Sequence, residues 1–142
     1  MINDDLRHTA AAAVGQEPFA RLFNIQLVDC SPGYALVEMT PTCETTNLFK
    51  MVHGGAIFAL IDEAFQVSCN THGTLAVALN VNVTYLRAPA VDVPLRAASR
   101  EVSRNPRIAT YHIEVTDNHG HLIASAQATA YRKKENNLFH AS

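Results

Sequence analysis

The hydrophobic pattern of the chain changes its period near residue 73. Before this point, apolar residues between Gly55 and Cys69 cover most of the circumference of a helix, and these are Ile57, Phe58, Leu60, Ile61, Ala64, Phe65 and Val67. A helix that is apolar nearly all round is buried rather than amphipathic. Beyond His72-Gly73 apolar and polar residues alternate with a period of two, which is typical of strands. The pattern therefore predicts one buried helix followed by a sheet.

Short turns separate the predicted strands. The strand-like segments are 25–30, 34–40, 78–86, 94–103, 107–117 and 121–131, and residues 3–14 and 17–23 predict two helices before them. Turn signals lie at Ser31-Pro32-Gly33, Asn105-Pro106 and residues 117–120. Consecutive strands with short turns pair antiparallel, because parallel strands need long crossovers. The expected class is α+β, a strongly curved antiparallel sheet of about six strands wrapped around one long central helix.

Length and composition predict a single domain. The chain has 142 residues, with 48% hydrophobic and 17% charged, which is enough for a sizeable core. We expect one domain over residues 1–142, with an N-terminal helical segment at 1–23 and a loose tail at 133–142.

Charge and targeting signals limit the partners that we expect. The net charge is −2 and no basic stripe is present, which argues against nucleic acid as a partner. No apolar run is long enough to span a membrane, and the N-terminus lacks the pattern of a signal peptide. The chain has three cysteines, scattered and odd in number, which fit reduced thiols better than a set of disulfides. We therefore expect a cytoplasmic protein without membrane association.

The segment from Asn47 to Asn70 carries the candidate chemistry. A His53-Gly54-Gly55 turn opens the predicted helix, where backbone N–H groups are free to bind an oxygen. Two acids, Asp62 and Glu63, stand in the middle of an otherwise apolar helix, where burial of an unpaired carboxylate costs several kcal/mol. An open amide donor and an unfavourably placed acid on one segment indicate acyl chemistry.

Helix geometry separates the two candidate groups. Eight helical residues span roughly 12 Å, whereas a base and an oxyanion donor that act on one carbonyl both lie within roughly 3 Å of the reacting atoms. Gly54 and Asp62 of one chain therefore cannot serve the same carbonyl, and a joint role requires a second subunit. The alternative is a Gly pair at a helix start and an acid at a helix boundary, with no catalytic role.

Other polar residues have competing interpretations. His53 is a candidate base, but a His before a helix is more often a cap. Asn47 could hold a water or a thioester oxygen, or simply stabilise a turn. The His119-x-His121 pair lies on a predicted hairpin without a carboxylate or Cys cluster, so we expect no metal site. Arginines near strand ends are either phosphate ligands or solvated charges, and these are Arg87, Arg104 and Arg107.

Three motifs resemble the hotdog-fold acyl-CoA thioesterases of the phenylacetic-acid-degradation (PaaI-like) family. They are H-G-G-A-x-F-A-L-x-D-E-A-F at 53–65 with Asn47 upstream, N-V-N-V-T-Y-L-R-A-P-A at 80–90, and I-E-V-T-D-x-x-G-x-L-I-A-x-A at 113–126. The resemblance covers nearly all of the chain beyond the first helix. It implies a hotdog fold, in which a curved antiparallel sheet surrounds a long helix.

The resemblance also implies roles for individual residues. Asp62 is then the catalytic carboxylate, as nucleophile or as base on water, and the N–H of Gly54 is the oxyanion donor. Asn47 orients the water or thioester, and His53 shapes the turn. The remaining candidates for contact with substrate are Gly55, Asn80, Asn82, Tyr85, Arg87, Arg104 and Arg107. The family has its sites between subunits of dimers or dimers of dimers, so a homotetramer is expected, with CoA as part of the substrate and no cofactor or metal.

The chain departs from the family pattern in three places. Ala78 stands where some relatives have Ser, one residue is inserted in Leu86-Arg87-Ala88-Pro89, and the next hairpin is Arg104-Asn105-Pro106-Arg107. The interpretation is an acyl-CoA thioesterase, and the alternative is a hotdog module that binds acyl-CoA or acyl-carrier protein without hydrolysis. A dehydratase fits less well, because its chemistry typically pairs a catalytic His with an acid.

Overall fold

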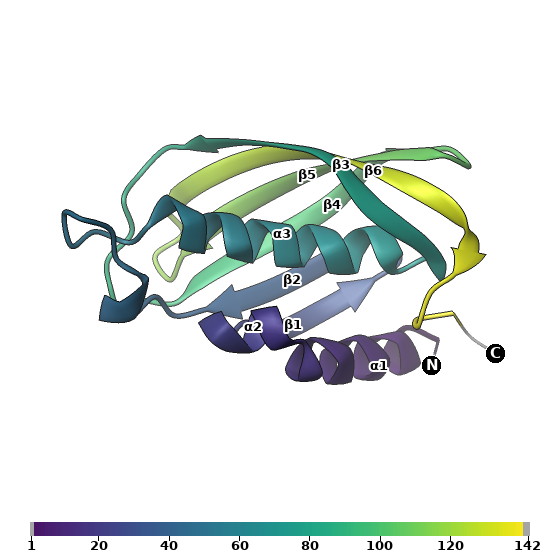
Figure 1. Ribbon diagram of the computed structural model, residues 1–142, viewed down its shortest axis with the longest axis horizontal. Helices are drawn as coiled ribbons and strands as arrows, with labels where there is room; N and C mark the ends of the chain where they lie inside the picture. Colours follow the sequence, from purple (N-terminus) through teal and green to yellow (C-terminus); the bar gives the residue numbers. More distant parts are fainter. Residues whose placement is uncertain (1, 141–142) are drawn as a thin grey trace.

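The computed structural model describes residues 2–140, which form three α-helices, one short 3-10 helix and six strands (Figure 1). The helices are α1 Ile2–Gln16, α2 Pro18–Phe23, η1 Cys43–Thr45 and α3 Gly54–Asn70. The strands are β1 Gln26–Ser31, β2 Tyr34–Met39, β3 Thr74–Tyr85, β4 Leu95–Arg104, β5 Ile108–Asp117 and β6 Leu122–Asn136. None of the helices in this described part is long and apolar enough to cross a membrane.

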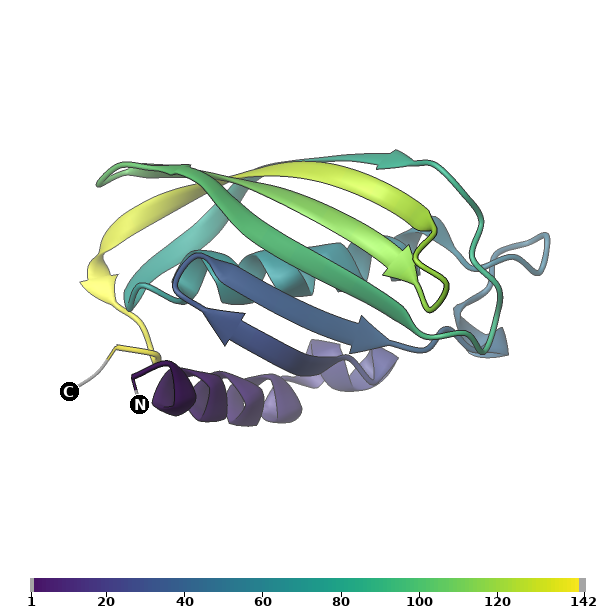
Figure 2. The ribbon, with the colours of Figure 1, turned by 180° about the vertical axis from the view of Figure 1, so that it is seen from behind.

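All six strands belong to one antiparallel sheet with the order β1-β2-β4-β5-β6-β3. The sheet curves around α3, which lies along its concave side and packs against β2, β3, β4 and β5 (Figures 1 and 2). β1 and β3 are the two edge strands. This arrangement confirms the predicted hotdog fold.

The burial of α3 explains why its sequence is apolar nearly all round. Leu60, Ile61 and Ala64 are fully buried beneath the sheet, and Phe65 packs edge-on against Tyr111 of β5 with ring centroids 5.5 Å apart. The buried polar contact between Ser68 Oγ and Ser99 Oγ, 2.7 Å long, joins the helix to β4. Packing on several strands at once leaves only a narrow stripe of the helix in contact with solvent.

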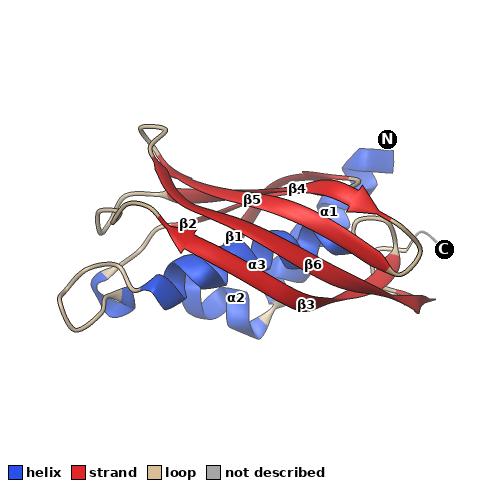
Figure 3. Cartoon of the chain, turned by 90° about the horizontal axis from the view of Figure 1, so that it is seen from above, coloured by secondary structure: helices blue, strands red, loops and turns tan. Residues whose placement is uncertain are grey.

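The N-terminal segment packs against β1 and α3. α1 packs against β1, and α2 contacts both α1 and α3 (Figures 1 and 3). Pro18 stands in the first turn of α2, where its missing N–H costs nothing. Asn24 ends α2 in the left-handed conformation with φ 52°, which is a common helix terminator. Ala10, Val14 and Ala20 are buried and join these helices to the hydrophobic core.

The expectation of a loose tail from residue 133 is wrong for the described residues. β6 continues to Asn136 in register with the start of β3. The side-chain amide of Asn137 then donates to Asn70 O at 2.9 Å, Asn70 Oδ1 at 2.9 Å and Thr74 O at 3.0 Å. Phe139 packs against the hydrophobic core. These contacts hold residues 137–140 on the C-terminal end of α3, while Met1, Ala141 and Ser142 lie outside the described residues.

Candidate active site

The start of α3 presents a single open backbone donor. His53 is the N-cap, and its Nδ1 accepts a 2.7 Å hydrogen bond from Gly55 N–H. The N–H groups of Ala56 and Ile57 both donate to His53 O. Within residues 2–140 the N–H of Gly54 has no recorded acceptor, and it stands at the positive end of the helix dipole. His53 therefore acts as the cap, and Gly54 keeps a donor for an incoming oxygen.

Tyr85 holds the peptide of Gly54 in place. Its hydroxyl donates a 3.0 Å hydrogen bond to Gly54 O. A Cβ atom at residue 54 would lie 3.3 Å from Tyr85 Cζ, so the glycine leaves room for the ring. At residue 55 a Cβ would lie 2.9 Å from His53 Nδ1, which accounts for the second glycine. Tyr85 thus contacts the turn of its own chain and fixes the carbonyl of the Gly54–Gly55 peptide.

Asn47 shapes the loop before α3. Its Oδ1 accepts hydrogen bonds from Phe49 N at 2.9 Å and from Met51 N at 3.1 Å. These bonds fix the carboxamide so that its NH₂ group is the part left to donate. The same loop exposes Leu48 at 95% and Phe49 at 78% to solvent in the single chain. Asn47 is therefore a turn residue by its contacts, and its NH₂ group remains able to bind an oxygen.

Within the described residues, the solvent-exposed side chains of α3 form one stripe along the helix, and Asp62 lies on this stripe. Gly55, Phe58 and Gln66 are the exposed helix residues, and half-buried Asp62 stands between them at helical spacing. Partial burial raises the pKa of Asp62 above its ordinary value of 3.8, and the nearby negative charge of Glu17 adds to this shift. The carboxyl group is thus a stronger base than that of an exposed aspartate. It remains partly accessible on the solvent-exposed stripe of α3.

Glu63 belongs to the buried side of α3. It is 3% exposed, and its Oε2 is buried without a hydrogen-bond partner in the described residues. Burial, followed by a hydrogen bond to Glu17 and the charges of Glu17 and Asp62, raises the pKa of Glu63 to about 9. Glu63 is therefore protonated and neutral near pH 7.

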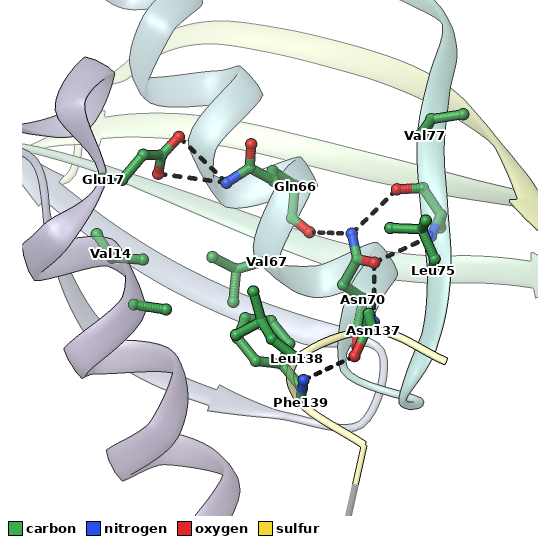
Figure 4. A pocket seen from close by; sticks show the side chains of 12 residues that line it. Val14, Glu17, Gln66, Val67, Asn70, Leu75, Val77, Asn137, Leu138 and Phe139 are labelled. Carbon is green, nitrogen blue, oxygen red and sulfur yellow. Dashed lines mark hydrogen bonds between the residues drawn. The ribbon is translucent and has the colours of Figure 1, made fainter. Parts of the chain in front are cut away.

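Sequence reasoning missed Glu17 and Gln66 as parts of this site. Gln66 Nε2 donates to both carboxylate oxygens of Glu17 at 3.3 Å (Figure 4). The position of Gln66 four residues after Asp62 was the available signal, because residues at this spacing share one face of a helix. No local pattern indicates Glu17, which comes from the junction of α1 and α2.

The arginine candidates divide between the two ends of the sheet. Arg87 lines a cavity of about 310 Å³ together with Gly54 and Tyr85. Arg104 and Arg107 line a different cavity of about 520 Å³, whose other basic residues are Arg132, Lys133 and Lys134. The second cavity also contains Thr74, at the opposite end of β3 from Tyr85. One chain therefore does not bring Arg87 together with Arg104 and Arg107.

Asn80 and Asn82 face away from α3. Their neighbours Val81 and Val83 pack against the core, and successive side chains of a strand point to opposite sides of the sheet.

The histidines of the β5–β6 hairpin do not form a metal site. His121 Nδ1 contacts Asp117 Oδ2 at 2.9 Å. No group of three or more His, Cys, Asp or Glu residues in the described chain is placed to hold a metal ion.

The curved sheet, the capped glycine turn and the half-buried acid define a hotdog-fold thioester hydrolase. The profile of the Thioesterase superfamily matches residues 49–124, which include the turn, Asp62 and the strands β3 to β5. The chain belongs to the Thioesterase superfamily, and within it to the PaaI-like hotdog thioesterases.

Individual relatives agree with this family. A protein of Archaeoglobus fulgidus that carries an esterase name is 40% identical over 80% of this chain and 74% of its own length. The acyl-coenzyme A thioesterase PaaI of Escherichia coli is 28% identical over 87% of this chain and 88% of its own. The solved structure of the E. coli PaaI protein from the phenylacetic acid degradation operon superposes with a TM-score of 0.90, covering 96% of this chain and 99% of that one at 25% identity.

Proposed function

We propose that this thioester hydrolase acts on acyl-CoA at sites shared between two subunits, with Asp62 of one chain and the N–H of Gly54 of the partner subunit. The observation that carries the proposal is the open N–H of Gly54, which stands at the start of α3 while every other N–H of the first helical turn is paired. Asp62 lies two helical turns further on, roughly 12 Å away within one chain. Two antiparallel copies of α3 would bring the two groups together.

The exposed edge of the sheet supports such a pairing of subunits. β3 is an edge strand, and Val77 and Leu79 on it are 40% and 58% exposed. A long apolar edge strand with unpaired backbone groups favours pairing with another strand. Phe58 on the solvent-facing stripe of α3 and the apolar loop Leu48-Phe49 add surface that a second copy would cover. We propose a homodimer formed in this way, with a dimer of dimers as the complete assembly.

Two chemical routes are consistent with this arrangement. In the first, Asp62 takes a proton from water, the resulting hydroxide attacks the thioester carbon, and the partner's Gly54 N–H stabilises the oxyanion. The C–S bond then breaks, and the CoA thiolate takes the proton from Asp62. In the second, Asp62 attacks the carbonyl carbon and expels the thiolate, and water hydrolyses the resulting anhydride. Neither route requires a group from outside the protein other than water.

The nucleotide end of CoA needs local positive charge, because the chain is slightly acidic with a net charge of −2. The cavity with Arg104 and Arg107 concentrates five basic side chains and is the proposed phosphate site. Arg87 is the competing candidate, since it lies beside Gly54 of its own chain.

Hybrid oligomers test the shared site. Gly54→Pro deletes the donor N–H and keeps a residue suited to the first helical position. Gly54→Ala is its matched control, because it adds a Cβ but retains the N–H. Differently tagged Asp62→Asn and Gly54→Pro chains are co-expressed, the hybrids are purified, and thiol release from acyl-CoA is measured.

The hybrids should regain part of the wild-type activity, because some interfaces pair an intact Asp62 with an intact Gly54. Each single variant assembled alone should remain inactive. Hybrids that form and stay inactive would refute the shared site, and a wild-type protein that binds acyl-CoA without releasing thiol would identify a binding module instead.

A further inference from the structure

The solvent-exposed stripe of α3 carries one large apolar side chain beside the half-buried acid. The stripe consists of Gly55, Phe58, Asp62 and Gln66, at helical spacings of three and four residues. Phe58 is 36% exposed, on a helix whose other apolar side chains are buried. Gln66 is already bonded to Glu17 (Figure 4). A second helix that packs on this stripe therefore has to cover a phenyl ring and accommodate a carboxylate.

The edge strand β3 fixes the direction in which a second copy of α3 would run. β3 is antiparallel to α3, because the Tyr85 hydroxyl donates to Gly54 O at 3.0 Å near one end and Ala76 N–H donates to Asn70 Oδ1 at 2.9 Å near the other. A two-fold axis perpendicular to the sheet that joins β3 to its own copy makes the two strands antiparallel and keeps both helices on the same side of the joined sheet. The two copies of α3 in the proposed dimer then also run antiparallel.

The proposed shared site then sets the register of the two helices. Phe58 stands four residues after Gly54 and four residues before Asp62, so it lies midway between them, about 6 Å along the helix axis from each. When Asp62 of each chain lies opposite the partner's Gly54, the two-fold axis passes through this midpoint. Phe58 therefore lies opposite the partner's Phe58.

The charges along the stripe favour the same register without reference to catalysis. With the axis at Phe58, each Asp62 carboxylate faces the positive N-terminal end of the partner helix, which stabilises a negative charge. An axis at Asp62 would bring two carboxylates together, which is unfavourable. An axis at Gln66 would place Asp62 opposite the partner's Asn70, at the negative end of that helix. An axis at Gly55 would leave only the first residues of the two helices in contact.

We propose, on the basis of the function above, that two copies of Phe58 pack against each other on the two-fold axis of the dimer and act as positioning residues for both active sites. Packed helices have their axes roughly 8–10 Å apart, depending on the side chains at the contact. A pair of phenyl rings on the axis holds the two helices near the wide end of this range. The gap on either side of the rings then separates Asp62 from the partner's Gly54. Each ring borders both sites, because each site lies about 6 Å from the axis along the helices.

Disulfide formation at single positions tests the register without an assay of activity. The background is Cys43→Ser, because Cys43 is exposed whereas Cys30 and Cys69 are buried. Phe58→Cys in this background should form a disulfide-linked dimer on oxidation, since Cα atoms that face each other across the axis of two packed helices lie within the roughly 4.4–6.8 Å that a disulfide spans. Gln66→Cys on the same stripe is the matched control, because its two copies would lie roughly 24 Å apart along the helix axes.

The linked fraction is measured by non-reducing gel electrophoresis, and the size of the unlinked protein by size-exclusion chromatography. Linkage at Phe58→Cys and not at Gln66→Cys is the expected result. A dimeric protein in which Phe58→Cys does not link, or links no faster than Gln66→Cys, would overturn the proposal.

The positioning role is tested by the size of the side chain at residue 58. Phe58→Ala removes the ring pair, so Asp62 loses its alignment with the partner's Gly54, and kcat should fall roughly tenfold or more while KM changes less. Phe58→Met keeps most of the volume and should restore most of kcat. Val102→Ala shortens an apolar side chain of β4 that is 68% exposed and should keep the wild-type kcat. A dimeric Phe58→Ala protein with wild-type kcat would refute the positioning role.

These measurements separate the placement of Phe58 from the function on which it rests. Linkage at Phe58→Cys in a protein that releases no thiol from acyl-CoA would refute the thioesterase function alone. Active hybrids of Asp62→Asn and Gly54→Pro chains, combined with no linkage at Phe58→Cys, would refute the placement of Phe58 alone. A wild-type protein that is monomeric by size-exclusion chromatography would refute both.

Discussion

Tyr85 and Gly54 form a tight pair in which the tyrosine hydroxyl donates a 3.0 Å hydrogen bond to the glycine carbonyl. A Cβ at residue 54 would approach Tyr85 Cζ to 3.3 Å, so the ring would have to move by a few tenths of an ångström to admit a side chain there. The strand β3 thus fixes the Gly54–Gly55 peptide of α3, which is adjacent to the His53–Gly54 peptide that carries the proposed oxyanion donor. A residue on one element therefore restrains the glycine whose backbone N–H is the donor on another.

Tyr85→Phe tests this positioning role. The loss of the hydroxyl removes one hydrogen bond at a half-exposed position, which should cost about 0.5–1.5 kcal/mol of stability. We expect kcat to fall while KM changes less, because the donor acts mainly in the transition state. Tyr131→Phe is the control, since Tyr131 has similar exposure and no recorded hydroxyl hydrogen bond within the described residues. If both variants lose the same activity, Tyr85 has no specific role at Gly54.

Asp62→Asn should remove activity without unfolding the protein. The amide keeps the size of the side chain but cannot accept a proton from water or attack a carbonyl. We expect kcat to fall by roughly 10²-fold or more, the range of general-base catalysis. Thiol release and circular dichroism measure the two effects, and Asp92→Asn in an exposed loop is the control. Near wild-type turnover in Asp62→Asn would end the proposed mechanism.

The acid limb of the pH–rate profile should depend on Glu17. Activity requires the ionised form of Asp62, so the rate should fall as the pH drops through the pKa of this group, which burial and Glu17 raise above 3.8. Glu17→Gln removes the neighbouring negative charge and should move the acid limb to lower pH. Glu114→Gln removes an exposed acid from the side of β5 that faces away from the core and should leave the limb unchanged. A limb that moves to higher pH in Glu17→Gln would contradict this electrostatic coupling.

The sequence predicted the architecture well, because its strongest signals are local. The apolar α3, the alternating strands and the short turns each follow from periods and turn residues within a few positions. The glycine turn and Asp62 were also visible, since both lie on one helical segment. The loose tail was predicted wrongly because Asn137 bonds to Asn70 and Thr74, and such distant partners leave no local pattern.

The sequence could not decide which member of the acidic pair is buried. Asp62 and Glu63 are adjacent on a helix that is apolar nearly all round, and only the tertiary packing, which places Glu63 near Glu17, assigns Glu63 to the covered side. The same limit applies to the arginines, because strand register rather than local sequence brings Arg132 to Arg107. Arg107 Nη1 donates to Arg132 O at 2.8 Å, across β5 and β6. These contacts depend on the tertiary fold.

The phosphate site is tested by comparing two sets of arginine variants. Arg104→Gln/Arg107→Gln should raise KM for acyl-CoA and change kcat much less, the pattern of lost uniform binding. The effect should shrink at high salt and vanish for a short thioester without the nucleotide. Arg7→Gln/Arg21→Gln makes the same change in net charge on the N-terminal helices and is the control. If Arg87→Gln alone raises KM and the double variant does not, the nucleotide binds beside Gly54 instead.

Glu63 should make the protein less stable as the pH rises. The folded protein keeps the proton on Glu63 up to a pKa of about 9, whereas the ordinary value is 4.5. The free energy of unfolding should therefore decrease between these two pH values, because the unfolded chain releases a proton that the folded state retains. Glu63→Gln preserves a donor toward Glu17 and cannot ionise, so it should flatten this dependence and raise stability at pH 8 by about 1 kcal/mol or more. Urea unfolding at several pH values measures the slope, and Glu135→Gln on the exposed end of β6 is the control. A slope in Glu63→Gln equal to that of the wild type would show that Glu63 is already ionised in the folded protein.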